Sequence, residues 1–328
     1  MNFQQEIIKL LVKETKLKKA ELENLISVPP DPKLGDYAFP CFKLGKNPKE
    51  AAEMLKKKLK LPKFLSGVQV VGPYLNFYVK NEVITEETLS KITKNKEDYG
   101  KQDIGKKQKV VFDFSSPNIA KPFGIGHLRS TVIGSCLYKV HNFLGYKSVG
   151  VNHLGDWGTQ FGKLIVAFNK WGKEKELEKD PIKYLLKLYV KFHEEADKDD
   201  TLNDEAREAF KQLEEGNEKY LSLWESFKEL SLKEFKKIYQ VLEIEFDSYH
   251  GEAFYNDKME KVINNLKKKK LTELSQGALI VDLEKYKMPP ILLEKSNGAT
   301  TYHTRDLAAA NYRLKQYKPI KLVYVVGS

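Results

Sequence analysis

The sequence has few of the features that mark secreted, membrane or disulfide-stabilised proteins. It contains two cysteines, Cys41 and Cys136, which are too few and too far apart for a disulfide framework or a zinc-binding spacing. No apolar run approaches the roughly 20 residues that a membrane-spanning helix needs. The amphipathic start lacks the apolar stretch and cleavage site of a signal peptide. These absences predict a cytoplasmic protein with no membrane partner.

The chain also lacks the motifs of the common nucleotide-binding loops. No G-x-x-x-x-G-K-[ST] sequence occurs, and Arg129 stands where a dinucleotide-binding loop has its third glycine. The six histidines suggest no Ser-His-Asp order, and Cys136 lies within an expected apolar helix, so we expect no covalent nucleophile. No internal repeat, low-complexity tract or dedicated metal site is evident.

What the chain does have is a substantial apolar fraction and an uneven charge. Of its 328 residues 41% are hydrophobic, enough to bury a core. Residues 1–110 hold 22 lysines and 14 acidic residues but no arginine, a net charge of +8. Such a region can follow a polyanion, because lysines near phosphates release counterions. A solvated lysine-rich face that aids solubility is the simpler interpretation of the charge alone.

The first third of the chain has the pattern of a small α+β domain, which we place at residues 1–105. A proline-rich bend follows the first helical pattern, and proline at the first helical position marks the start of the second helix. The expected elements are helices over residues 3–14 and 48–59, strands over 68–71 and 75–79, and a linker over 94–109.

Residues 106–328 alternate strand and helix patterns, which predicts a Rossmann-like, doubly wound parallel sheet. A long helical pattern over about 172–270 interrupts the alternation and predicts a helical insertion. The expected strands are 110–114, 148–151, 278–283, 291–294 and 322–326, with helices over 126–144 and 304–317. In such folds ligands bind at the carboxyl ends of the strands.

The segment from Ser115 to Thr131, SSPNIAKPFGIGHLRST, combines a polar turn, a glycine pair and a helix start. Gly124 and Gly126 allow a ligand to approach the backbone closely, and a helix N-terminus favours phosphate. His127 can donate a hydrogen bond and Lys121 can add charge. A glycine pair alone is a weak signal, and a simple structural turn is the alternative.

Two further stretches place polar side chains after strands. Asn152, His153 and Asp156 follow the second expected strand within VNHLGDWGTQFG. In YHTRDLA, Asp306 can accept a bidentate hydrogen bond from a guanidinium and Tyr302 can stack on it. Taken alone, these stretches also suit a turn and a helix cap or an internal Arg305–Asp306 pair.

Together the three stretches are similar to arginyl-tRNA synthetases. The first resembles the family signature SPN-[IV]-A-K-P-[FM]-H-x-G-H-L-R-S-T, which contains the nucleotide motif of class I synthetases. The second resembles N-H-x-G-D-W-G-x-Q-F-G, and the third Y-x-T-R-D-[IL]-A. The first hundred residues are more loosely similar to the added domain of the family, which contacts the tRNA elbow. The resemblance spans the whole chain.

The resemblance implies an arginine–tRNA ligase that activates arginine with ATP and Mg²⁺ and transfers it to tRNA(Arg). We expect a monomer. It implies Lys121 and His127 as catalytic residues. The implied arginine-binding residues are Ser116, Pro117, Asn118, Asn152, Tyr302 and Asp306. The implied ATP-binding residues are Gly124, Gly126, His127, His153, Gly155 and Asp156.

One position departs from the family pattern, since Gly124 stands where the family has its first histidine. The sequence also stops before the mobile lysine-bearing loop and the helical anticodon-binding domain of the family. We therefore expect a C-terminally incomplete catalytic domain and a 328-residue chain that charges tRNA poorly by itself. The alternatives are a non-catalytic tRNA- or protein-binding relative, which these departures favour, and another H-x-G-H nucleotidyltransferase.

Overall fold

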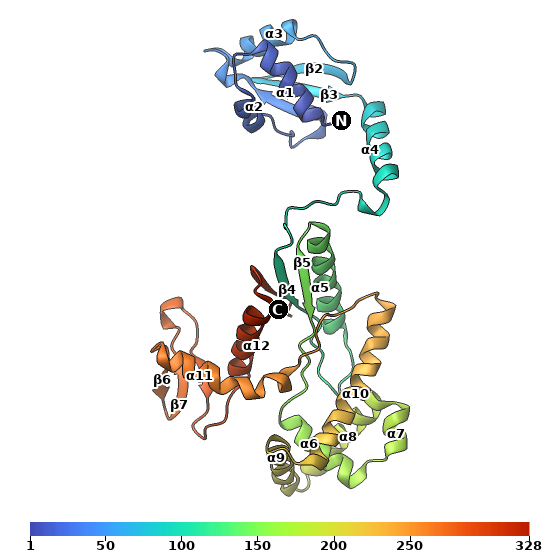
Figure 1. Cartoon of the computed structure of the whole chain (residues 1–328), viewed down its shortest axis with the longest axis vertical. Coiled ribbons are helices and arrows are strands. Elements are labelled where there is room, and N and C mark those ends of the chain that lie inside the picture. The colour runs from blue at the N-terminus through green and yellow to red at the C-terminus, as the bar shows by residue number, and fades with distance from the viewer. Residues whose placement is uncertain (328) are drawn as a thin grey trace. The chain divides into compact units, whose positions relative to one another are not determined.

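The computed structural model describes residues 1–327 and divides the chain into two compact units, Met1–Gly100 and Lys101–Ser328 (Figure 1). The units are described separately. Among the described residues, no helix has the length and apolar character needed to cross a membrane. The predicted boundary at residue 105 remains a prediction.

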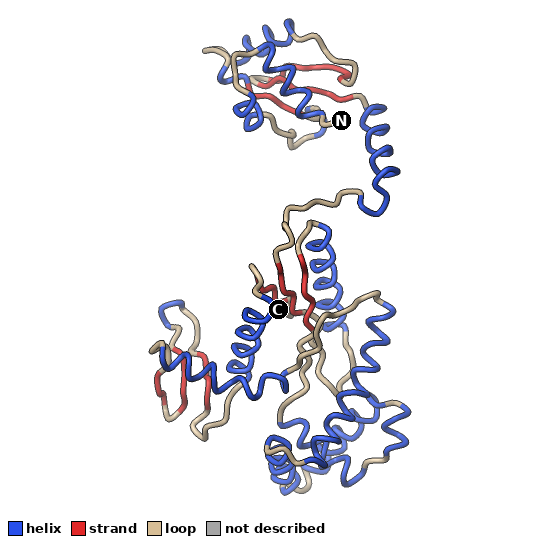
Figure 2. The backbone as a smooth tube through the Cα atoms, viewed as in Figure 1, coloured by secondary structure: helices blue, strands red, loops and turns tan. Residues whose placement is uncertain are grey.

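The first unit is a three-stranded antiparallel sheet with helices packed on it (Figure 2). The strand order is β1-β3-β2, with Val68 opposite Phe77. Its core forms where the apolar faces of α1 and α3 meet the sheet, around Ile7, Leu55 and Phe77. The elements are α1 (Phe3–Glu14), α2 (Lys19–Leu25), β1 (Tyr37–Pro40), α3 (Pro48–Lys58), β2 (Leu65–Val71), β3 (Tyr74–Val79) and α4 (Asn81–Asn95).

The centre of the second unit is a parallel sheet with the strand order β5-β4-β9. Val110 on β4 lies opposite Ser148 on β5 and Lys321 on β9. Helix α5 connects β4 to β5, and α12 precedes β9. The bounds are β4 (Lys109–Asp113), α5 (Ile125–Phe143), β5 (Lys147–Val151), α12 (Tyr302–Tyr317) and β9 (Lys321–Tyr324). The parallel sheet confirms the predicted fold class.

Five helices between β5 and β9 form a bundle with its own core (Figure 1). Helix α6 packs closely on α9, because Gly162 leaves space for the backbone of Ala206. Buried aromatic and leucine side chains such as Phe161, Leu185 and Phe227 fill the centre. The helices are α6 (Thr159–Trp171), α7 (Glu174–Lys179), α8 (Pro181–Ala196), α9 (Thr201–Glu214) and α10 (Glu218–Val241).

A smaller antiparallel sheet with the order β6-β7-β8 lies before α12 in the chain. It is preceded by a 3-10 segment, η4, and by α11, which packs on α12. The bounds are η4 (Glu252–Lys258), α11 (Met259–Lys268), β6 (Glu273–Ser275), β7 (Ala278–Val281) and β8 (Ile291–Glu294). The strands predicted over 278–283 and 291–294 therefore form, but in this separate sheet.

Candidate active site

The turn after β4 has an unusual backbone. Ser115, Ser116 and Ala120 have φ angles of 77°, 47° and 61°. These values lie in the left-handed backbone region, which residues other than glycine rarely adopt. Each such residue costs of order 1–3 kcal/mol and persists only where its surroundings fix it. Residues 115–120 form the start of the first sequence motif, so the polar groups there are held in a specified shape.

Helix α10 and the loop after β5 fix this turn. The hydroxyl of Tyr239 lies 2.7 Å from Ser115 Oγ and accepts a hydrogen bond from Asn152 Nδ2 at 2.9 Å. Asn152 Oδ1 in turn accepts from the backbone N–H of Ser116 at 3.2 Å, and Ser231 Oγ accepts from the N–H of Ala120. Tyr239 is 2% exposed, and burial raises its pKa to about 12. It therefore stays a neutral hydroxyl.

Replacing Tyr239 by Phe is expected to lower the free energy of unfolding by about 1–3 kcal/mol, because buried Ser115 and Asn152 lose a hydrogen-bond partner. Urea denaturation measures this change. Tyr249→Phe is the matched control, since the Tyr249 hydroxyl has no hydrogen bond recorded with residues 1–327. Equal stability of the two variants would argue against the clamping role of Tyr239.

The first and second motifs are joined directly by backbone. Gly155 N–H donates to Pro117 O, and Ile119 N–H donates to Gly155 O, both at 3.1 Å. This forms a parallel bridge between Asn118 and Gly155. A Cβ atom at Gly155 would overlap the side-chain oxygen of Asn118, so glycine is needed for the Asn118 side chain to keep this position. The predicted site residues of these two motifs thus lie side by side.

The N-terminus of α5 carries the predicted nucleotide-binding residues. The N–H of Gly124, the N-cap residue, donates to His127 Nδ1 at 3.1 Å. Since Nδ1 accepts, a neutral ring carries its proton on Nε2. Partial burial lowers the pKa of His127 and favours that neutral form. A Cβ at Gly126 would meet nothing within 4 Å. The helix start is open to a ligand, with one imidazole donor beside it.

Lys121 and Asp156 differ in whether their charged groups are paired within the protein. The ammonium of Lys121 lies 6.0 Å from the ring centre of Tyr189 on α8 and has no carboxylate partner among residues 1–327. Asp156 is fully buried: its Oδ2 lies 2.6 Å from Lys228 Nζ, and its Oδ1 accepts from the N–H of Ala253. Asp156 therefore holds the loop after β5 against α10 and η4. Its contact with ATP remains a prediction.

Helix α12 presents the third motif at its first turn. Tyr302 is 64% exposed, and Asp306 follows one turn later on the same face. Arg305 instead turns toward η4, where it lies 3.5 Å from Glu252 and donates to Asn256. Asp306 thus has no ion pair among the described residues. Removal of water by the surrounding protein raises its pKa. Its carboxylate remains free for a cationic ligand.

Sequence reasoning missed the buried groups that connect α12 to the sheet. Arg313 is 1% exposed; its Nη1 lies 2.7 Å from Asp113 Oδ2, and its Nη2 lies 3.3 Å from His153 Nδ1. Glu252 was missed as well, and burial raises its pKa to about 7. Asp113 ends an apolar strand, which is the one signal that could have pointed to it.

The structure joins some predicted site residues and leaves others apart. Ser116, Pro117 and Asn118 contact Asn152 and Gly155 directly. His153 connects through Arg313 to the helix that carries Asp306. No hydrogen bond or ion pair within residues 1–327 joins Lys121 or His127 to Tyr302 or Asp306.

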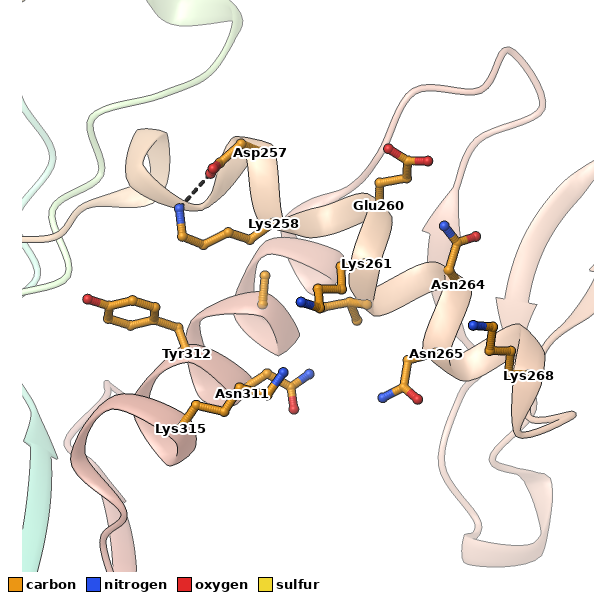
Figure 3. Close-up of a pocket in the computed structure, with 12 residues that line it drawn as sticks. Asp257, Lys258, Glu260, Lys261, Asn264, Asn265, Lys268, Asn311, Tyr312 and Lys315 are labelled. Atoms are coloured by element: carbon orange, nitrogen blue, oxygen red, sulfur yellow. Dashed lines mark hydrogen bonds and ion pairs between the residues drawn. The ribbon is translucent and has the colours of Figure 1, made fainter.

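A groove of about 740 Å³ lies outside this site, between α11 and α12 (Figure 3). Lysine and asparagine side chains surround it, among them Lys261, Asn264, Lys268, Asn311 and Lys315. None of the predicted site residues lines it.

Comparison with known proteins agrees with the resemblance. The family model described as tRNA synthetases class I (R), catalytic domain, matches residues 88–328, and the arginyl tRNA synthetase N terminal domain matches residues 1–79. Proteins named arginine–tRNA ligase match along the whole chain, at 51% identity in Clostridium kluyveri and 49% in Halothermothrix orenii. The chain spans 58% and 59% of the length of these two relatives.

A solved structure is similar in fold. The crystal structure of arginyl-tRNA synthetase from Plasmodium falciparum superposes with a TM-score of 0.67 at 26% identity, covering 91% of this chain and 54% of that one. The catalytic-domain model covers most of the chain, and relatives about half identical to it extend along its full length. This chain therefore belongs to the arginyl-tRNA synthetase family of class I tRNA synthetases.

Proposed function

We propose that this chain carries the arginine- and ATP-binding parts of an arginine–tRNA ligase. The observation that carries the proposal is the backbone bridge between Asn118 and Gly155 at the carboxyl end of the parallel sheet. It joins two family motifs. Arg313, on the helix that carries Tyr302 and Asp306, contacts His153 of the second motif and Asp113, which accepts a hydrogen bond from Ser116 of the first. Three stretches far apart in sequence thereby contribute to one site.

In this proposal arginine lies against the turn after β4 and the start of α12. Asp306 accepts hydrogen bonds from the guanidinium, and Tyr302 lies beside it. The remaining arginine contacts come from the polar groups next to the sheet, namely Ser116, Pro117, Asn118 and Asn152. The free carboxylate of Asp306 and the fixed shape of residues 115–120 support this assignment.

ATP occupies the start of α5 in the same proposal. Gly124 and Gly126 let its phosphates approach the helix N-terminus, and His127 and Lys121 stabilise charge there. His153, Gly155 and Asp156 complete the nucleotide side. The arginine carboxylate oxygen attacks the α-phosphorus and pyrophosphate leaves; Mg²⁺ bound with ATP would offset the charge of the phosphates. The terminal hydroxyl of tRNA(Arg) then attacks the mixed anhydride, releasing AMP. Catalysis in this scheme rests on holding the reactants in line and on stabilising the developing charge.

Arginine-dependent exchange of pyrophosphate into ATP, in the presence of total tRNA, tests the proposal in the natural protein that carries this chain. We expect exchange with arginine and none with lysine. Gly124→His should leave the rate equal or higher, because the family pattern has histidine at this position and a Cβ at Gly124 would meet only His127 Nδ1, at 4.0 Å. Exchange that does not need arginine would indicate another nucleotidyltransferase. Binding of tRNA without any exchange would indicate a non-catalytic relative.

The first unit, in this proposal, contacts tRNA through its lysine-rich surface. Residues 1–105 should bind tRNA weakly, with an affinity that falls as salt rises. Lys56, Lys57 and Lys58 are exposed at the end of α3. Changing all three to Gln should reduce the slope of log affinity against log salt by about 0.7–0.9 per lost phosphate contact. Salt-independent binding, or no binding at low salt, would contradict this role.

The proposal includes a monomeric protein that acts in the cytoplasm.

A further inference from the structure

The inference concerns Arg313 and begins with its position. Arg313 lies in the fourth turn of α12, and its side chain is the largest of the fully buried ones among the described residues. Its guanidinium reaches two other elements: Nη1 lies 2.7 Å from Asp113 Oδ2 at the end of β4, and Nη2 lies 3.3 Å from His153 Nδ1 after β5. Tyr324 on β9 lies beside it, with the ring centre 5.5 Å from Cζ.

This contact determines where the proton of His153 can be. A guanidinium has only donors, so the Nδ1 atom that faces Arg313 has to accept the hydrogen bond. A neutral imidazole with an accepting Nδ1 carries its proton on Nε2. A doubly protonated ring would place an N–H and a positive charge against the guanidinium. The neighbour therefore selects one tautomer of the neutral ring.

The charges around His153 explain why it needs such a neighbour. Carboxylates face it from three elements: Asp113 on β4, Asp156 in the loop after β5, and Asp306 on α12. Each of them favours a protonated ring. Burial lowers the pKa of His153, and the positive charge of Arg313 lowers it further. The Tyr255 ring of η4 packs on the imidazole at 5.5 Å. Without the positive charge of Arg313, the three carboxylates would raise the pKa of His153 with less opposition.

We propose that Arg313 is a positioning residue that keeps His153 neutral with its proton on Nε2. His153 Nε2 forms no hydrogen bond within residues 1–327, so this N–H is available to a ligand. It suits an acceptor oxygen of a carboxylate or phosphate, and not a guanidinium, which offers only donors. A neutral ring also places no positive charge of its own beside Asp306, the proposed partner of a cationic substrate.

The ligand part of this inference rests on the proposed function, whereas the state of the His153 ring does not. The ring is therefore tested first, by ¹⁵N NMR of the histidine-labelled 328-residue chain. His153→Gln identifies the signals. In the unmodified chain we expect a pyridine-type Nδ1 and a pyrrole-type Nε2 at neutral pH. A proton on Nδ1, or an imidazolium at neutral pH, would overturn the inference.

Variants then separate charge from geometry. Arg313→Met should move the His153 titration to higher pH. Arg313→Lys retains the charge but lacks the planar fork that reaches Asp113 and His153 together. An ammonium paired with Asp113 alone leaves Nδ1 without its donor, so the titration should stay low while both tautomers appear. Arg305→Met is the matched control, because Arg305 lies on the same helix but contacts Glu252 and Asn256. An unchanged His153 titration in Arg313→Met would contradict the role. If Arg313→Met does not fold, the tautomer and titration of His153 in the unmodified chain and in Arg313→Lys still test the inference.

Arginine affinity provides the functional readout. In Arg313→Met it should fall more steeply on acidification than in the unmodified chain, because an imidazolium beside Asp306 opposes a cationic ligand. Conservation of the same pH dependence in both proteins would refute the link to the substrate. If neither the unmodified chain nor Arg313→Met binds arginine, the proposed function fails, while the NMR result on His153 remains valid.

Discussion

Replacing Asp306 by Asn is expected to weaken arginine binding about 10- to 150-fold, which corresponds to about 1.5–3 kcal/mol for a charge-assisted hydrogen bond. The carboxylate has no ion pair among the described residues, so a guanidinium can take both of its oxygens. The amide retains the shape but loses the charge and one acceptor. Calorimetry with arginine measures the change.

Asp257→Asn is the control for this substitution. Asp257 is an exposed carboxylate that pairs with Lys258 and lies outside the proposed site. Its replacement should leave arginine affinity unchanged. If both variants bind arginine as tightly as the unmodified chain, Asp306 is not the guanidinium partner.

Gly155→Ala is expected to reduce arginine activation by roughly 100-fold, because a displacement of about 1 Å in a positioning group can cost that much. The added Cβ overlaps the side-chain oxygen of Asn118. The backbone hydrogen bonds of the bridge are unaffected, so the fold should persist while the side chain of Asn118 moves. Initial rates of pyrophosphate exchange measure the effect, and circular dichroism verifies folding.

Gly45→Ala is the matched control. Gly45 has open space around it, so an alanine there should change neither rate nor stability. If Gly155→Ala activates arginine at the unmodified rate, the position of the Asn118 side chain has no catalytic importance.

Local patterns predicted the elements that surround the site. The apolar run before Ser115 became β4, and the helical pattern over 126–144, which is followed by Gly145, became α5. These elements depend on periodicity and on terminal glycines, which act over a few residues. The expected linker over 94–109 was partly wrong, since α4 extends to Asn95 and a 3-10 turn follows. Polar composition does not distinguish an exposed helix from a linker.

Contacts between distant residues could not be predicted from such patterns. Arg313 and Asp113 are 200 positions apart in the sequence, and Tyr239 contacts Ser115 although 124 positions separate them. Nothing in the local sequence of a helix indicates which strand end its buried arginine will reach. The motifs supplied candidate ligand contacts, whereas the groups that hold those contacts in place appeared only in the fold.

The most direct test of the central proposal is transfer of labelled amino acids to total tRNA by the natural protein that carries this chain. With saturating ATP, we expect label on tRNA with arginine and none with lysine or glutamine. The signal should fall in Asp306→Asn and Gly155→Ala but not in Asp257→Asn. Charging of tRNA with a different amino acid, or equal charging by all four proteins, would contradict the proposed site and its function.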